Sequence, residues 1–198
     1  MAKNTQPILK RCRTLGVSPA AMGYSKSSNK NPGGQRRAKK SEYALQMTEK
    51  QKVKFVYGIL EKQFRMYFEK AERMNGNTGE NLLSLVERRL DNVVYRLGFA
   101  STRREARQLV NHGHFTVNGQ RVNIPSYLIK VGDVIAVCEK SVSNAFFKKL
   151  KEDDAFVAAP KWLDRDKNNL VGKVIAMPTQ ADIDFEIAVH LIVELYSK

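Results

Sequence analysis

Residues 89–137 read RLDNVVYRLGFASTRREARQLVNHGHFTVNGQRVNIPSYLIKVGDVIAV, and the organisation of the chain follows from this stretch. Asp91 is expected to cap a short helix that Gly98 ends. A carboxylate accepts the free N–H groups at a helix start, and glycine tolerates the left-handed conformation at a helix end. Thr102 and Glu105 have the spacing of a capping box, which predicts a second helix in the segment STRREARQLVNHG.

A β-hairpin is expected directly after the second helix. The apolar segment Phe115–Val117 and the pair Arg121 and Val122 flank Asn118-Gly119, which is a strong signal for a two-residue hairpin turn. Gly132-Asp133 predicts another turn before the apolar strand Val134–Val137. The stretch therefore predicts two helices packed on a short, mainly antiparallel sheet.

The second helix carries many arginines on the side that should remain open. Ala106, Leu109 and Val110 recur at helical spacing and predict the buried stripe. The polar residues expected on or beside the open face are Arg103, Arg104, Arg107, Gln108 and Asn111. Arginine binds phosphate with two parallel hydrogen bonds, and a helix N-terminus also attracts anions. The alternative is that Arg104 and Glu105 pair with neighbours on an ordinary charged surface.

The charge of the chain favours a polyanionic partner. Its 198 residues contain 34 Lys and Arg against 20 Asp and Glu, a formal net charge of +14. Residues 1–41 contain no acidic residue, and such a block repels itself unless a polyanion neutralises it. Its cations include Lys10, Arg11, Arg13, Arg36, Arg37, Lys39 and Lys40. The alternative is a soluble protein whose surface is basic without such a partner.

The sequence argues against a membrane or secreted protein. No apolar stretch approaches the ~20 residues that span a bilayer. The N-terminus MAKNTQPILKRCR lacks the apolar run of a signal peptide, and the basic block lacks the aromatic face of an interfacial helix. Cys12 and Cys138 do not make a disulfide framework, so a reduced, cytoplasmic protein with no membrane partner is expected.

Outside the central stretch, the apolar pattern predicts helices. Residues 48–74 carry apolar side chains at alternating four- and three-residue steps, which predicts one amphipathic helix that Asn75-Gly76-Asn77 ends. Similar spacing predicts a helix over residues 82–90 and a C-terminal helix over residues 187–195. Residues 27–40, SSNKNPGGQRRAKK, have no such period and are expected to be a loop.

The helix pair and hairpin of residues 89–137 resemble the RNA-binding module named after the fourth protein of the small ribosomal subunit. The segments GNTGENLLSLVERRLDNVVYRLG at residues 76–98 and HLIVELYSK at residues 190–198 extend the resemblance to that ribosomal protein family, of bacterial or organellar type. The resemblance covers nearly the whole chain from about Lys40 onward. It is looser over the basic block that precedes it.

This resemblance implies an α+β fold with an inserted module. Residues 1–42 would form a basic, irregular N-terminal arm. Residues 43–91, completed by residues 165–198, would form a helical domain. Residues 92–164 would form the RNA-binding module inserted between its two parts.

The resemblance also implies a function. It implies a structural ribosomal protein that binds a helix junction in the 5′ region of small-subunit ribosomal RNA and nucleates assembly of the subunit. It further implies small-subunit proteins three and five as neighbours, a position at the messenger RNA entry path, an influence on translational accuracy, and repression of its own messenger. The remaining expected RNA contacts are Lys52, Arg65, His112, His114 and Arg121.

No zinc or other cofactor is expected. His112 and His114 flank Gly113, but no cysteine or carboxylate stands near them at ligand spacing. Many members of the family hold zinc with four cysteines in the arm, whereas Cys12 is the only cysteine in the arm of this sequence. One thiolate cannot make a tetrahedral structural site, so the sequence is similar to the zinc-free form of the family.

No enzymatic activity is expected. Glu87, Asp91 and Asp133 each have a structural role available as cap, surface partner or turn residue, and no catalytic triad or phosphate-binding glycine loop is present. The same module also occurs in RNA-modifying enzymes, and these need a separate large catalytic domain. The alternatives are a fragment of such an enzyme, or a factor that visits stalled ribosomal particles without residing on them.

Overall fold

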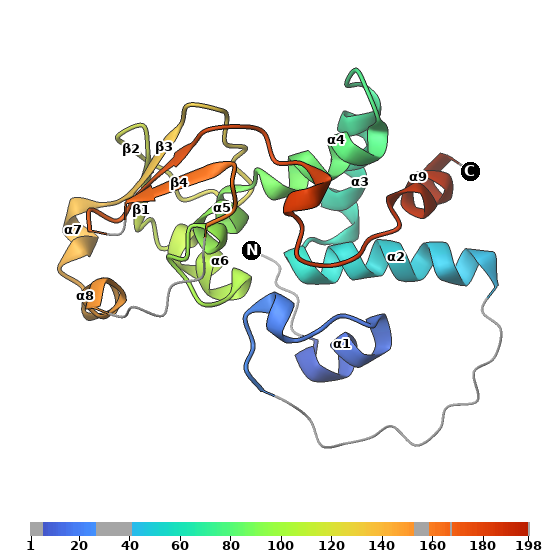
Figure 1. Ribbon diagram of the computed structural model, residues 1–198, viewed down its shortest axis with the longest axis horizontal. Helices are drawn as coiled ribbons and strands as arrows, with labels where there is room; N and C mark the ends of the chain where they lie inside the picture. The colour runs from blue at the N-terminus through green and yellow to red at the C-terminus, as the bar shows by residue number, and fades with distance from the viewer. Residues whose placement is uncertain (1–5, 27–40, 153–158, 167, 198) are drawn as a thin grey trace. The chain divides into compact units, whose positions relative to one another are not determined.

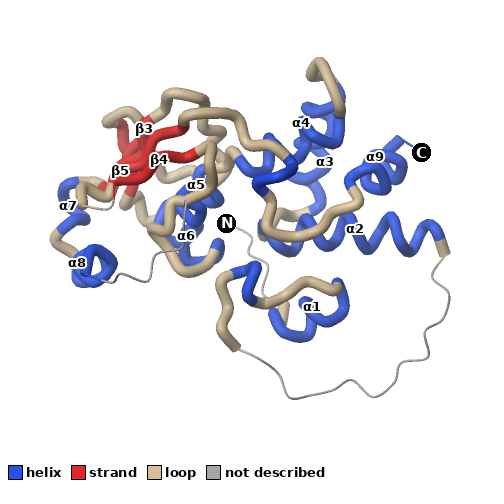
Figure 2. Tube along the Cα trace, viewed as in Figure 1, coloured by secondary structure: helices blue, strands red, loops and turns tan. Residues whose placement is uncertain are grey.

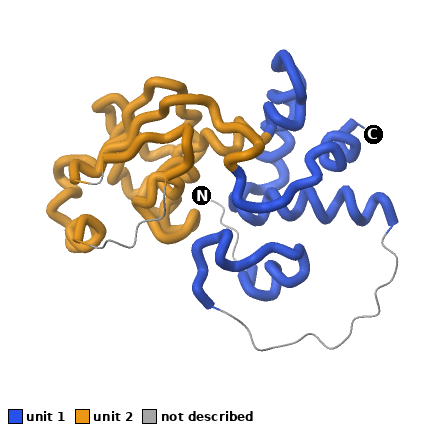
Figure 3. The backbone as a smooth tube through the Cα atoms, viewed as in Figure 1, with its two compact units in different colours: residues 1–82, 183–198 blue, residues 83–182 orange. Residues whose placement is uncertain are grey.

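The computed structural model describes residues 6–26, 41–152, 159–166 and 168–197. The chain divides into two compact units, residues 1–82 with 183–198 and residues 83–182 (Figure 3). The described part of the first unit is helical, and the second combines helices with a sheet (Figure 2). The expected α+β class is therefore confirmed.

The described part of the first unit consists of helices and one 3-10 turn. Its elements are α1 (Ile8–Leu15), the 3-10 turn η1 (Ala20–Met22), α2 (Glu42–Tyr57), α3 (Glu61–Glu72), α9 (Val189–Ser197) and the start of α4 (Thr78–Glu87). Gln46 Nε2 on α2 donates to Glu194 Oε2 on α9 at 3.0 Å. The Ala188 N–H donates to Glu49 Oε2 at 3.1 Å. These contacts join the last helix of the chain to α2.

The basic arm is more regular than expected. Residues 8–15 form α1, which buries Cys12 and Leu15 and ends at Gly16 with a φ of 68°. Two buried side chains, three residues apart in this short segment, are too weak a pattern to predict a helix from the sequence. The expected loop over residues 27–40 lies outside the described residues.

The long helix expected over residues 48–74 is two helices. The first, α2, begins at Glu42 because the Ser41 hydroxyl accepts the Ala44 N–H at 3.3 Å. It ends at Gly58, which has a φ of 64°, and α3 begins at Glu61. The apolar period continues through the break, but a left-handed glycine ends a helix whatever the period of its neighbours.

The second unit contains one antiparallel sheet of five strands in the order β2-β1-β3-β5-β4. The strands are β1 (Phe115–Val117), β2 (Gln120–Arg121), β3 (Val134–Val137), β4 (Leu163–Asp166) and β5 (Val171–Val174). The helices of the unit are α5 (Leu90–Arg96), α6 (Arg103–Asn111), α7 (Glu139–Val142) and α8 (Ala145–Glu152), with η2 (Gln180–Asp182) at its end. Figure 1 shows α5 and α6 on one side of this sheet.

The inserted module was expected to comprise residues 92–164, whereas the second compact unit comprises residues 83–182. Residues 165–198 were expected to complete the helical domain, but β5 pairs with β3, with Val134 opposite Lys173. Residues 165–182 therefore lie with the sheet. A four-residue strand whose partner lies far away in the sequence gives little local signal, which explains the difference.

The hairpin between β1 and β2 is confirmed. Val117 pairs with Gln120, and the two turn residues both have positive φ, 49° at Asn118 and 81° at Gly119. Two successive positive φ angles define the turn that matches the twist of a hairpin, and Asn-Gly is the pair that adopts it most readily.

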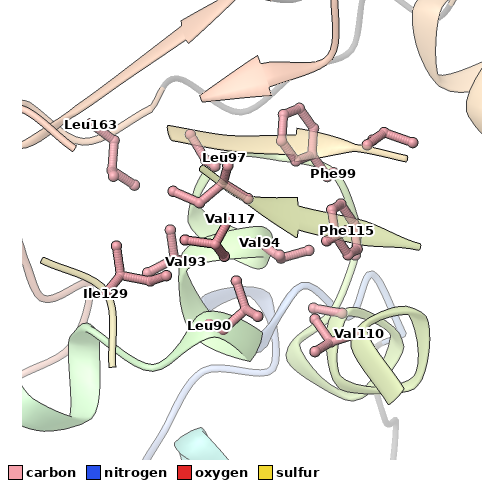
Figure 4. Packing of buried hydrophobic residues seen from close by; sticks show 14 of the residues in the cluster. Leu90, Val93, Val94, Leu97, Phe99, Val110, Phe115, Val117, Ile129 and Leu163 are labelled. Carbon is pink, nitrogen blue, oxygen red and sulfur yellow. The ribbon is translucent and has the colours of Figure 1, made fainter. Parts of the chain in front are cut away.

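The core of the second unit lies between the helices and the sheet. Figure 4 shows Leu90, Val94 and Leu97 of the α5 region facing Phe115 and Val117 of β1. All of these side chains are buried, as is Trp162, the only tryptophan of the chain. Trp162 is therefore a core residue.

Gly172 of β5 allows α5 to approach the sheet closely. A Cβ atom at this position would lie 2.4 Å from both methyl carbons of Leu97. A larger residue at this strand position would therefore push the helix away from the sheet.

Asp91 does not cap α5 as expected. The N–H groups of Leu90 and Asp91 donate to the carbonyls of Tyr127 and Pro125, so the loop before β3 supplies the cap. The carboxylate of Asp91 instead accepts two hydrogen bonds from the guanidinium of Arg89, at 3.0 and 2.7 Å. Asp91 Oδ1 also accepts the Asn92 N–H at 3.0 Å, so the carboxylate still satisfies one donor of the first turn, although the N-cap position is Arg89.

Candidate nucleic-acid interface

The start of α6 has the predicted capping box. Thr102 Oγ1 accepts the Glu105 N–H at 3.2 Å, and Glu105 Oε2 accepts the Ser101 N–H at 2.7 Å. Each side chain thus satisfies a backbone donor near the helix start. The two bonds fix the direction in which α6 leaves the preceding loop.

The open face of α6 carries a narrow polar stripe. Arg104, Gln108 and His112 are exposed and stand four residues apart along the helix, so they share one face. Asn111 is half-buried beside them. We call Arg104, Gln108 and His112 the α6 stripe.

Arg103 does not lie on the open face, which corrects the expectation from the sequence. Only 7% of this residue is exposed, and its Nε donates to Asn92 Oδ1 at 2.8 Å. The guanidinium carbon lies 4.4 Å from the ring centroid of Tyr95, a cation–π contact. The helical period explains this placement, because position 103 lies on the same stripe as the buried residues Ala106 and Val110.

Arg107 is also partly structural. Its side chain is 17% exposed, and its Nη1 lies 3.8 Å from Asp91 Oδ2. That carboxylate already holds Arg89 in a buried ion pair. Arg107 therefore lies between the ion pair and the surface, with less of its side chain open than the sequence predicted.

A buried polar network supports this helix pair, and sequence reasoning missed it. The carboxylate of Glu87 accepts hydrogen bonds from Arg96 at 2.8 and 3.1 Å and from Asn92 Nδ2 at 2.6 Å. Asn92 in turn accepts from Arg103. The signal was the cluster of charged residues in ERRLDN at residues 87–92, within an otherwise apolar run, because buried charges occur in pairs.

Arg121 lies on the C-terminal end of α6. Its Nε donates to the Gly113 carbonyl at 2.8 Å and its Nη2 donates to the His112 carbonyl at 3.1 Å. A Cβ at Gly113 would lie 2.5 Å from Arg121 Nε, so this contact requires the glycine. The residue remains exposed and places positive charge beside the α6 stripe.

His114 differs from its neighbour His112. Its Nδ1 lies 2.9 Å from Ser141 Oγ, and its ring packs edge-on against Phe147. Burial, together with the nearby charges of His112 and Arg121, lowers the pKa of His114 below its ordinary value. His114 is therefore mainly a packing residue.

The remaining candidate residues lie in the first unit or outside the described chain. Lys10 and Arg13 are exposed on α1, whereas Arg11 is half-buried and donates to Gln6 Oε1 at 2.7 Å. Lys52 is held by Glu49 at 2.6 Å and by the Glu186 carbonyl. Arg65 is exposed, 3.4 Å from Glu69. Arg36, Arg37, Lys39 and Lys40 lie outside the described residues.

Metal ligands do not gather in the described part of the chain, where no group of three or more His, Cys, Asp or Glu residues is placed to hold an ion. The Cys12 thiol is buried and lies 3.8 Å from Met22 Sδ. Burial raises the pKa of this thiol. A thiol that resists ionisation is a poor metal ligand.

None of the described helices is both long and apolar enough to cross a membrane.

Known proteins resemble this chain over its whole length. The family profile for the ribosomal protein S4/S9 N-terminal domain matches residues 3–87, and the S4 domain profile matches residues 88–135. The small ribosomal subunit protein uS4 of Caldicellulosiruptor bescii is 58% identical, with all of both chains covered. The uS4 proteins of Clostridioides difficile and Fusobacterium nucleatum are 55% and 52% identical, again with full coverage of both chains.

These relatives are named as ribosomal proteins rather than enzymes, which agrees with the expectation that the chain catalyses no reaction. The two profiles together match residues 3–135, which is more than half of the chain, and the relatives align with it over its full length. The chain belongs to the bacterial uS4 family of structural proteins of the small ribosomal subunit.

Proposed function

We propose that this protein binds small-subunit ribosomal RNA directly and that the α6 stripe is a central part of the contact. The observation that carries the proposal is the exposure of Arg104 and Gln108 on one face of a helix that a buried network holds in place. Arg121 adds a positive charge at the end of this stripe. A rigid ridge of arginine and amide donors suits phosphate and base edges of a folded RNA.

The basic first unit supplies a second contact in this proposal. Lys10 and Arg13 on α1 are exposed cations in a segment without any carboxylate. Two contact surfaces in one chain would bind as a bivalent clamp, because the first contact raises the effective concentration of the second. The division of the chain into a basic arm, a helical domain and an inserted RNA-binding module belongs to the same proposal, with residues 165–182 counted in the module because β5 pairs with β3.

The finer roles follow from the family resemblance. We infer that the protein binds a helix junction in the 5′ region of the RNA and nucleates assembly of the subunit. Its neighbours would be small-subunit proteins three and five, beside the messenger RNA entry path, where it would affect translational accuracy. The free protein would also repress its own messenger.

The direct test uses the full chain and a transcript of the 5′ domain of a bacterial small-subunit ribosomal RNA. Chemical footprinting should reveal a protected multi-helix junction, and binding should weaken steeply with added salt because phosphate contacts release counterions. A footprint scattered over the transcript, or binding indifferent to salt, would contradict the proposal.

Two rival functions make different predictions. A resident ribosomal protein should remain at one copy per subunit after a high-salt wash, whereas a recycling factor should be lost. An RNA-modifying enzyme should change its RNA in a turnover assay. Recovery at one copy per washed subunit, with unmodified RNA, is the outcome expected here.

We also propose that the protein functions without zinc. Cys12 is the only cysteine among residues 1–41, and its buried thiol contacts Met22. Elemental analysis of the purified protein should therefore detect no stoichiometric zinc. One zinc per chain would contradict this proposal.

A further inference from the structure

We propose that the first unit contains a pocket for a single unpaired RNA base, formed by α1, the turn after it and η1. This inference rests on the proposed RNA binding and names a subsite for it. The chain turns back after α1 (Figure 1), and these segments line an open cavity of about 530 Å³. Pockets that hold small organic groups commonly measure roughly 300–1,000 Å³.

The floor of the cavity is apolar. It is lined by Leu9, Cys12 and Val17, of which Cys12 is 1% and Val17 6% exposed. A phosphate would lose its hydration in such a place without gaining hydrogen bonds, whereas a flat aromatic base would bury apolar surface. The floor therefore favours a base over the sugar–phosphate backbone.

The wall and rim carry the groups that bind unpaired nucleotides. The half-buried Tyr24 lines the cavity, and Arg13 and Lys26 line it from exposed positions. The cavity lining includes no acidic residue. Single-stranded nucleic acid is commonly bound by an aromatic ring that stacks on a base, with cations beside it for the backbone phosphates.

The pocket is preformed. The N–H groups of Gly16 and Val17 both donate to the Cys12 carbonyl, which closes the turn after α1. The Tyr24 N–H donates to the Pro19 carbonyl at 3.1 Å, and this bond holds the wall against η1. A cavity fixed in this way loses little conformational entropy when a base enters.

The test measures binding of full-length variants to the 5′ domain transcript over a range of salt. Tyr24→Leu should bind roughly tenfold more weakly, the order of loss for one base–aromatic stack, with an unchanged salt slope because no charge is removed. Tyr24→Phe keeps a ring and should bind as the unchanged chain does. Ala20→Phe, which places a ring at the edge of the cavity, should weaken binding without removing any group that could contact RNA.

A second measurement does not depend on affinity. A photo-crosslinking benzophenone side chain in place of Tyr24 should form an adduct with one base of the transcript. The Arg104→Ala variant reports on the proposed α6 contact in parallel. If Tyr24→Leu and Ala20→Phe bind normally and no adduct forms, while Arg104→Ala binds weakly, the base pocket is refuted and RNA binding stands. If the unchanged chain fails to bind the transcript, both proposals fall.

Discussion

Asn92 Oδ1 accepts a hydrogen bond of 2.8 Å from Arg103 Nε, and this contact joins α5 to α6. The amide nitrogen of Asn92 donates to Glu87 Oε2 at 2.6 Å, so one side chain connects the arginine to a buried carboxylate. A buried polar network of this kind favours the one arrangement in which all its members are paired. Arg103, one of the residues expected to contact RNA, thus helps to hold the helix that presents the α6 stripe.

The first prediction separates the two neighbouring arginines of α6. Arg104 is exposed, so Arg104→Ala should weaken RNA binding and lower the slope of log K against log salt by about one, with little change in the free energy of unfolding. Filter binding at several salt concentrations and urea denaturation measure the two quantities.

Arg103→Ala is the matched variant and should behave in the opposite way. It removes the donor to Asn92 and the cation over Tyr95, so the free energy of unfolding should fall by about 1–3 kcal/mol while the salt slope stays unchanged. A lowered slope for Arg103→Ala, at unchanged stability, would mean that this side chain reaches the RNA after all.

The second prediction concerns the buried ion pair of Glu87 and Arg96. The Glu87 side chain is 1% exposed and that of Arg96 6%. Glu87→Gln would leave the guanidinium buried without a carboxylate, and such a loss typically costs about 3–5 kcal/mol. Thermal and urea denaturation should both register this destabilisation.

Glu80→Gln is the control for that change, because Glu80 is exposed on the same helix, α4. Its free energy of unfolding should differ from that of the unchanged chain by no more than about 0.5 kcal/mol. If the two variants were equally stable, Glu87 would not be the structural centre of the network.

The sequence predicted the elements of residues 89–137 better than it predicted their contacts. The capping box of Thr102 and the Asn118-Gly119 turn depend on neighbouring residues only, so both could be predicted. The burial of Arg103 was implied by its spacing from Ala106 and Val110, but the type of side chain suggested the surface. Its partner Asn92 lies eleven positions earlier, and no local rule pairs the two.

The difference between local signals and contacts of distant residues also explains why some predictions elsewhere in the chain were wrong. Gly58 ends α2 within residues 48–74, but the apolar period continues past it, so the period alone predicted one long helix. The pairing of β5 with β3 and the cap that Tyr127 supplies to α5 both join segments more than thirty residues apart. Contacts of this kind depend on the tertiary fold, which a single sequence does not specify locally.

The third prediction compares two glycines with left-handed backbone. Gly119 has a φ of 81° and open space around its missing Cβ, whereas Gly113 has a φ of 71° and the Arg121 guanidinium beside it. Each change to alanine should cost about 1–2 kcal/mol for the backbone alone. Gly113→Ala should cost about 1 kcal/mol more, because Arg121 must leave the carbonyls of Gly113 and His112.

A double-mutant cycle isolates that additional cost. In an Arg121→Ala background, the losses for Gly113→Ala and Gly119→Ala should become similar, since no guanidinium remains to be displaced. A difference that persists in this background would place its cause somewhere other than Arg121.

The fourth prediction concerns acid stability and the carboxyl group of Glu61. Partial burial alone would raise its pKa, but hydrogen bonds from Lys54, Tyr196 and Lys50 outweigh this effect and lower the pKa from 4.5 to about 2. The folded chain therefore binds this proton less readily than the unfolded chain. The stabilisation should be fully present above pH 4.5 and should be lost as the pH falls towards 2.

Urea denaturation at pH 6 and pH 3 should reveal this contribution as a difference between the unchanged chain and Glu61→Gln. The Glu61 side chain is 47% exposed, so solvent screening should limit the contribution to about 1 kcal/mol. Other carboxylates also titrate in this range, but they do so in both proteins, and the comparison cancels them. Glu61→Gln should therefore be less stable at pH 6 and should lose less stability on going to pH 3. Equal acid losses in the two proteins would show that the contacts with Lys54 and Tyr196 do not favour the ionised carboxylate.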